Sequence, residues 1–177
     1  MNVRKLLGAL ALLVFLPACF ARAQDIKPME DHPEAHYFDF WEGTWNQVID
    51  GKVDLTRTEF RVRRGVHPAA FEEEWRQVLD PKTTLRAAAI RAWDKIAGRW
   101  MYVWVSENGL FQVWEGRKFG RDWYIVRPFD INGDKYLSRQ AWISNGPDRL
   151  IRVSERSNDE GRTWQLRFRE EYQRASR

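Results

Sequence analysis

The sequence predicts an all-β protein: an antiparallel up-and-down barrel of about ten strands, preceded by a short N-terminal helical arm. From Trp45 onward, short β-rich runs alternate with turn signals such as Asp50-Gly51 and Glu107-Asn108-Gly109. Connections this short make sequential strands antiparallel neighbours. A long meander of twisted strands has two edges to protect, and closure into a barrel removes both.

Residues 1–23 have the pattern of a secretory signal peptide. Arg4 and Lys5 precede the apolar run Leu6–Leu16, and the small-residue site Ala21-Arg22-Ala23 follows. An apolar run of this length makes about 16 Å of helix, which is too short for a bilayer core of about 30 Å. We therefore expect cleavage after Ala23, no transmembrane segment after processing, and an exported protein that is periplasmic or secreted.

The only cysteine, Cys19, lies in that leader. Leu16-Pro17-Ala18-Cys19 resembles the lipid-attachment box of bacterial lipoproteins, so a lipid anchor on Cys19 is the alternative, although proline fits that box poorly. Cleavage after Ala23 leaves 154 residues without cysteine. A mature chain of that kind has no intramolecular disulfide and no cysteine-based zinc site.

Charge and composition exclude several classes of protein. Outside residues 1–23 there are 26 basic and 25 acidic residues, so the net charge falls from +4 to +1. No basic cluster remains of the kind that binds nucleic acid. Aromatic residues make up 14% of the chain, which is not the composition of a disordered protein.

The elements follow in order along the chain. Residues 24–40 form the arm, in which Asp31 is a candidate cap and Pro33 suits the first positions of a short helix. Residues 41–174 form one barrel domain without an internal linker. The expected strands are Trp45–Ile49, Lys52–Arg63, Ala70–Val78, Thr84–Trp93, Arg99–Ser106, Leu110–Arg117, Trp123–Phe129, Tyr136–Ser144, Leu150–Arg156 and Thr163–Tyr172.

Most strands carry a tryptophan, and the period of two assigns its neighbours to the same face. If the tryptophans point inward, the polar residues that join them are Glu73, Gln77, Arg91, Gln112, Arg127, Ser138 and Gln140. A buried arginine needs either Glu73 or an anionic ligand group as its partner. An aromatic lumen with a few polar anchors is typical of a small-molecule pocket.

The candidate ligand-binding residues are accordingly Trp45, Arg91, Trp93, Trp100, Tyr102, Trp104, Arg127 and Trp142. The alternative is a lumen filled by its own tryptophans, with Arg91 or Arg127 reaching outward at a rim. Met101, Val103 and Val105 are apolar on the opposite face, so this strand alone does not say which side is inside.

The segment 157–164, Ser-Asn-Asp-Glu-Gly-Arg-Thr-Trp, matches the Asp-box pattern of sialidase propellers at every defined position. About ten strands cannot build a propeller of four-stranded blades, so we interpret this single copy as a hairpin stabiliser. Asp159 would accept backbone hydrogen bonds, Gly161 would take a positive φ, and Trp164 would pack beneath the turn.

Two other motifs have a chemical and a structural interpretation. The segment 130–134, Asp-Ile-Asn-Gly-Asp, lacks the glycine and acid that an EF-hand needs further on, so it predicts a tight turn. His32 and His36 are four residues apart, but Pro33 stands where a zincin has glutamate and no third ligand is evident. We predict no metal and no cofactor.

Acidic and nucleophilic residues give no clear sign of catalysis. Glu72, Glu73 and Glu74 alternate between faces, so they form no facing pair and only one of them turns inward. The chain has no G-x-S-x-G elbow and no P-loop. The sequence thus favours a binding protein over an enzyme.

The stretch 38–45, Phe-Asp-Phe-Trp-Glu-Gly-Thr-Trp, ends in the G-x-W that opens the first barrel strand of lipocalins and related calycins. Together with Trp93-Asp94, Arg99-Trp100 and the Asp box, it resembles an exported bacterial family of calycin-like barrels over residues 36–174. The resemblance implies that Trp45 plugs the barrel base and that a later arginine packs across it. It implies no reaction.

Haem barrels of the nitrobindin type, which are also calycin-like, use a late histidine, and this chain has none after His67. The leading expectation is an exported barrel that binds a small, largely apolar ligand, with or without an anionic group. The alternatives are a filled barrel that acts as a protein-interaction module in the cell envelope, and an enzyme with a lumenal site.

Overall fold

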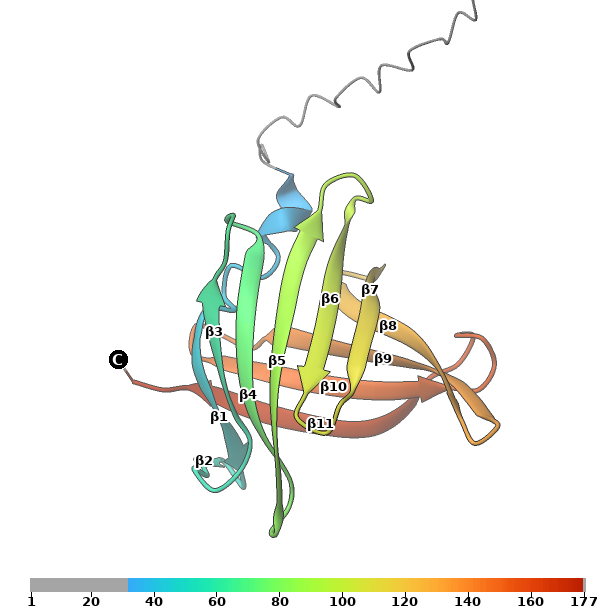
Figure 1. Cartoon of the computed structure of the whole chain (residues 1–177). Helices are drawn as coiled ribbons and strands as arrows, with labels where there is room; N and C mark the ends of the chain where they lie inside the picture. The colour runs from blue at the N-terminus through green and yellow to red at the C-terminus, as the bar shows by residue number, and fades with distance from the viewer. Residues whose placement is uncertain (1–31, 177) are drawn as a thin grey trace, which may run out of the picture. The chain divides into compact units, whose positions relative to one another are not determined.

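The structure is a computed structural model, and it describes residues 32–176. These residues form a closed antiparallel barrel of ten strands with one extra short strand, β2, and one turn of 3-10 helix, η1 (Figure 1). The elements are η1 (Pro33–His36), β1 (Gly43–Ile49), β2 (Lys52–Val53), β3 (Glu59–Arg64), β4 (Ala70–Asp80), β5 (Thr83–Asp94), β6 (Arg99–Ser106), β7 (Phe111–Phe119), β8 (Asp122–Ile131), β9 (Asp134–Ser144), β10 (Arg149–Ser157) and β11 (Gln165–Arg174).

Sequential strands pair from β3 to β11, β3 pairs with β1, and β11 returns to β1, so the predicted meander and its closure are confirmed. In the first and last strands, Trp45 lies opposite Arg174 and Val48 lies opposite Glu171. Closure leaves the ten barrel strands without an unpaired edge. The closed barrel agrees with the calycin-like fold that the resemblance implies.

One predicted strand, Lys52–Arg63, is divided in two by a turn. The Asp54 carboxylate accepts hydrogen bonds from the backbone N–H of Thr56 at 2.9 Å and from its hydroxyl at 2.6 Å. A side chain that binds the backbone two residues on competes with ladder pairing. The strand therefore ends at Val53 and resumes at Glu59.

The last strand begins two residues later than predicted because Thr163 is hydrogen-bonded within the Asp-box turn. Asp159 accepts hydrogen bonds from the backbone N–H of Thr163 at 2.9 Å and from its hydroxyl at 2.6 Å. Gly161 has a φ of 91°, and its N–H donates to the Ser157 hydroxyl at 2.8 Å. The segment is a hairpin stabiliser, as predicted.

The described part of the arm, residues 32–40, contains one turn of 3-10 helix, η1, which begins after His32. The Nδ1 atom of His32 accepts a hydrogen bond from the backbone N–H of Glu34 at 3.3 Å, so His32 caps the turn. Asp31, our predicted cap, lies outside the described residues.

The base of the barrel is locked by Trp45 and Arg174. Trp45 is fully buried, and the Arg174 guanidinium lies 4.2 Å from the centre of its ring. Arg174 also donates to Asp148 at 3.1 Å and to the carbonyl of Phe40 at 2.9 Å. An arginine thus packs across the first-strand tryptophan.

Candidate functional site

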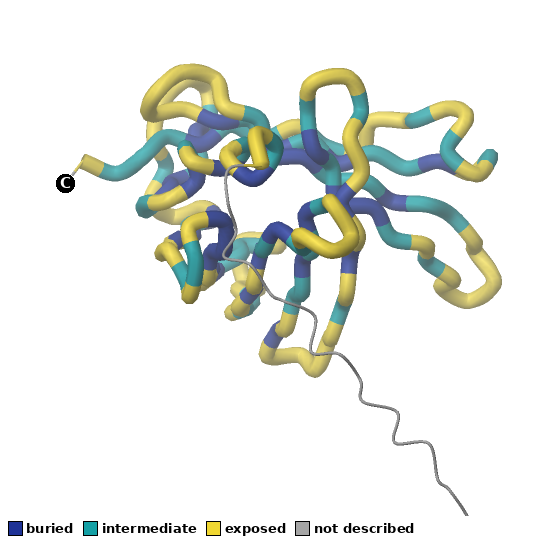
Figure 2. Tube along the Cα trace, turned by 90° about the horizontal axis from the view of Figure 1, so that it is seen from above, coloured by how far each residue is buried: buried dark blue, intermediate teal, exposed yellow. Residues whose placement is uncertain are grey.

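The inner face of the barrel contains the predicted tryptophans together with charged side chains. Seen from above, buried and exposed positions alternate along the strands (Figure 2). Glu73 and Arg91, each two residues from a buried tryptophan, are 1% and 0% exposed. The period-two assignment therefore identifies the inner face correctly on β4 and β5.

Arg91 and Glu73 form a buried ion pair in the middle of the lumen. The Arg91 Nε atom donates to Glu73 Oε1 at 2.9 Å. The indole N–H of Trp41 donates to the same oxygen at 2.9 Å, and that of Trp75 donates to Oε2 at 3.0 Å. Three donors compensate the carboxylate for its loss of water.

Aromatic rings surround the Arg91 guanidinium. Its carbon lies 4.4 to 5.1 Å from the ring centres of Phe38, Trp41, Tyr102 and Trp142. Within residues 32–176 the two terminal nitrogens have no hydrogen-bond partner. Cation–π attraction within about 6 Å compensates the charge instead. Arg91 is thus part of the packed core and is committed to Glu73.

Glu34 closes the end of the barrel beside η1, which is the same end that Trp45 and Arg174 close. Its backbone carbonyl accepts from the indole of Trp100 at 3.0 Å, and its carboxylate accepts from the indole of Trp123 at 2.7 Å. Lys118 forms an ion pair with the same carboxylate. These hydrogen bonds, that from Lys118 first, hold the pKa of Glu34 below its ordinary value.

At the opposite end the lumen opens into a cavity of about 320 Å³. Its wall is aromatic, with amides and two arginines among the rings. The lining residues are Trp75, Gln77, Leu79, Leu85, Tyr102, Trp104, Asn108, Leu110, Gln112, Trp114, Ile125, Gln140, Trp142, Arg152, Arg167 and Phe168. The volume lies at the lower end of the range for small-molecule sites.

Arg152 forms the polar side of this cavity. Its terminal nitrogens donate to Glu170 at 3.1 Å and to Gln140 at 2.9 Å, and its Nε atom has no partner among the described residues. Burial alone would lower the pKa of Arg152, but Tyr172 and Glu170 hold it above its ordinary value. Burial in turn raises the pKa of Tyr172, whose hydroxyl donates to Glu170 at 2.8 Å. The guanidinium is therefore charged and fixed in place.

Arg167 reaches the cavity because β11 contains a bulge. Ser154 pairs with Phe168 and Glu155 pairs with Leu166, which leaves Arg167 as the extra residue. A bulge can turn a side chain that would otherwise face outward, so Arg167 and Phe168 both line the cavity. Arg167 is exposed and has no hydrogen bond or ion pair within the part of the chain that the structure describes.

The eight predicted site residues fall into three groups. Tyr102, Trp104 and Trp142 come together at the cavity. Four others lie in the packed core, away from the cavity: Trp45, Arg91, Trp93 and Trp100. Arg127 lies with its guanidinium 5.1 Å from the ring of Phe129 and does not line the cavity.

Sequence reasoning did not select Arg152 or Arg167. Arg152 lies two residues from Leu150, which is fully buried, and the period of two therefore places both on the inner face. That spacing could have identified Arg152 as inward-facing. A bulge is required to place Arg167, and neighbouring residues in a strand otherwise alternate between faces.

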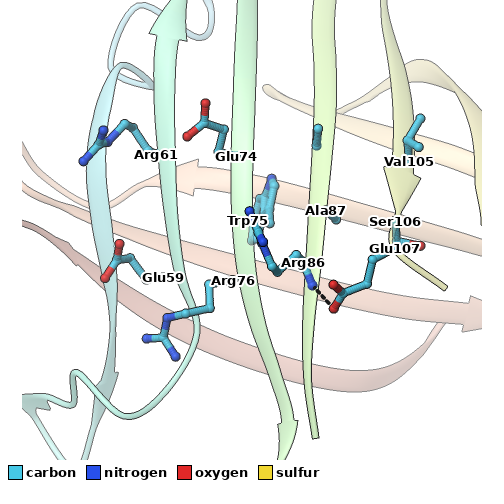
Figure 3. Close-up of a pocket in the computed structure, with 11 residues that line it drawn as sticks. Glu59, Arg61, Glu74, Trp75, Arg76, Arg86, Ala87, Val105, Ser106 and Glu107 are labelled. Carbon is cyan, nitrogen blue, oxygen red and sulfur yellow. Dashed lines mark hydrogen bonds between the residues drawn. The ribbon is translucent and has the colours of Figure 1, made fainter.

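Two larger hollows lie on the surface and are lined mainly by charged side chains. One, of about 760 Å³, runs over the outer face of β3 to β6, where Glu59, Arg61, Glu74, Arg76 and Glu107 surround small β5 alanines (Figure 3). The other, of about 900 Å³, surrounds Arg174 at the base. Pockets with an apolar wall and few polar groups are the usual ligand sites, so the lumenal cavity fits best.

Within residues 32–176 there is no group of three or more acidic, histidine or cysteine side chains that could hold a metal ion. His32 caps η1, and His36 bonds to Asp39 at 3.0 Å. None of the described helices is long and apolar enough to cross a membrane. Comparison of the sequence with protein-family models and with curated proteins found no match.

Proposed function

We propose that this protein binds a small, largely apolar molecule that carries one anionic group, in the open half of its barrel. The supporting observation is the cavity of about 320 Å³ between Trp104, Trp142 and Arg152, with Arg167 at its edge. Since a water molecule occupies about 30 Å³ of liquid, this space suits a ligand of about ten to fifteen heavy atoms.

The anionic group would lie at Arg167. Arg152 already donates hydrogen bonds to Glu170 and Gln140, whereas Arg167 has no such partner within residues 32–176. A charge-assisted hydrogen bond contributes about 1.5 to 3 kcal/mol, and the aromatic wall supplies apolar contact for the rest of the ligand. Arg167 thus takes the role that the sequence suggested for Arg91 or Arg127.

The leader pattern in residues 1–23 supports the cell envelope or the exterior as the place of action. Anchoring at Cys19 remains the alternative to release after Ala23. Mass spectrometry of the exported protein separates the two, because a diacylglycerol adduct on Cys19 would exclude simple cleavage.

Titration calorimetry with octanoate and octanol tests the proposal, because the two probes have the same chain and differ in charge. We expect octanoate to bind at least tenfold more tightly than octanol. Arg167→Gln should abolish the preference. Arg169→Gln is the matched control, since Arg169 lies on the same strand and pairs with Glu171 at 2.6 Å.

A second variant tests the place of binding. Gln77 lines the cavity, and Gln77→Phe adds a ring to that space. We expect this variant to lose octanoate binding while it keeps its unfolding midpoint. Undiminished binding by Gln77→Phe, or equal loss in both arginine variants, would exclude the lumenal site.

A further inference from the structure

The outer face of β5, β6 and β7 is apolar where a solvent-facing sheet is normally polar. Because Trp100 and Tyr102 point inward, the residues between and after them point outward. We call the following six residues the outer apolar patch: Ile90, Met101, Val103, Val105, Phe111 and Val113.

The register makes the outer apolar patch continuous. Val103 pairs with Ile90 on one side and with Val113 on the other, and Val105 pairs with Phe111. Ile90, Phe111 and Val113 are 57%, 65% and 48% exposed. Ala88 and Ala92, the neighbours of Ile90 on the same face of β5, have short side chains, so no side chain next to Ile90 on this strand projects beyond the patch.

The same sheet is charged on the strands next to the patch. Glu72 and Glu74 of β4 face outward, and Arg63 of β3 pairs with both, at 3.5 and 3.2 Å. Antiparallel sheets with one solvated face follow this polar-out pattern. The barrel interior is packed from the other face, so folding does not require apolar side chains outside. Contiguous exposed patches mark interaction sites.

The charges around the patch indicate which partner fits. Acid and base are already paired there, since Arg99 bonds to Glu115 at 3.1 Å and Arg63 bonds to the β4 acids. A membrane-binding face would instead present a surplus of basic residues. A partner with a net charge of one sign would find no excess of opposite charge around the patch. A second copy, in contrast, has the same paired charges around the same apolar centre.

The area is sufficient for a weak dimer. The patch with a one-residue rim covers about five strands by seven residues, which is roughly 24 Å by 23 Å. Two copies would bury about 1,100 Å² between them, just above the minimum of about 1,000 Å² for a specific interface and in the range of weak, transient complexes. We propose that the protein forms a two-fold dimer in which the outer apolar patches of two barrels pack face to face.

Val103 lies at the centre of the patch, so in a two-fold interface it lies close to its own counterpart. Val103→Asp places two carboxylates together there, and Val103→Lys places two ammonium groups together. Either variant alone should be monomeric. An equimolar mixture should form a dimer again, because each carboxylate then meets an ammonium group.

Sedimentation velocity over a concentration series measures these states. We expect the unmodified protein to dimerise with a dissociation constant of the order of micromolar, and each Val103 variant to weaken the dimer at least tenfold. Leu166→Asp is the matched control, because Leu166 is 63% exposed on β11 and outside the patch, and it should leave the dimer intact.

Three outcomes overturn the proposal: a monomeric unmodified protein at concentrations well above micromolar, a dimer that persists in both Val103 variants, or a mixture of the variants that stays monomeric. The mixing step also guards against misfolding, since a variant that fails to fold cannot recover its dimer by mixing.

Discussion

The buried pair of Arg91 and Glu73 should determine the stability of the barrel, and Arg91→Met tests this. Methionine keeps a long unbranched side chain that packs well against aromatic rings. It removes the charge that compensates Glu73, which is 1% exposed. Removing one partner of a buried pair costs about 3 to 5 kcal/mol, because the other charge is left in a low-dielectric environment.

The cost should fall at the middle of that range, at about 4 kcal/mol. Two indole donors, from Trp41 and Trp75, remain on the carboxylate and moderate the loss.

Glu73→Gln completes a double-mutant cycle. Alone it leaves Arg91 charged among four rings, and we expect it to cost about 3 kcal/mol. The double variant with Arg91→Met lacks both charges. We expect it to lose about 2 kcal/mol of unfolding free energy, less than either single variant, because one indole N–H keeps only a poor hydrogen bond. Double-mutant cycles isolate such coupling when the residues are in contact.

Urea unfolding followed by tryptophan fluorescence measures these changes, because the chain has ten tryptophans and most are buried. A loss below about 1 kcal/mol in Arg91→Met would refute the reasoning. A double variant that loses the sum of both single changes would show that the two residues act independently.

Three further changes have defined outcomes. The lowered pKa of Glu34 means that its stabilising contribution is fully present above its unfolded-state pKa of about 4.5 and is lost as the pH falls through its lower folded-state pKa. The difference in unfolding midpoint between the unmodified protein and Glu34→Gln should therefore vanish in acid. In Gly116→Ala the new Cβ would lie 2.3 Å from the Trp100 carbonyl oxygen, and chemical denaturation should show a loss of about 1 to 3 kcal/mol. Arg174→Lys loses the planar contact across Trp45, and thermal unfolding should reveal a loss of about 2 kcal/mol that the retained charge does not prevent.

Local patterns predicted most of the fold. Alternation identified Glu73 and Arg91 as inward-facing, and turn residues identified the hairpins, because both features depend on neighbours in sequence. The division of the second predicted strand was missed because Asp54 was treated as a strand residue, and its side chain instead bonds to Thr56.

The depth of each side chain in the lumen could not be predicted in the same way. Alternation says that a residue points inward, but its height along the barrel axis depends on strand tilt and stagger, which are properties of the closed sheet. Trp93 and Trp104 lie on inner faces alike, yet Trp93 packs near η1 and Trp104 lines the open cavity. The position of Arg167 at the cavity depends on a bulge in β11, which no local sequence pattern predicted.

The buried pair also explains why the cavity lies where it does. Arg91 and Glu73 need complete compensation, so rings fill the half of the lumen around them and leave space only beyond. Trp142 connects the two halves, since its ring lies 4.4 Å from the Arg91 guanidinium and 5.5 Å from that of Arg152, and it lines the cavity. Arg91 therefore does not contact the ligand in our proposal; it packs against Trp142, which forms part of the cavity wall.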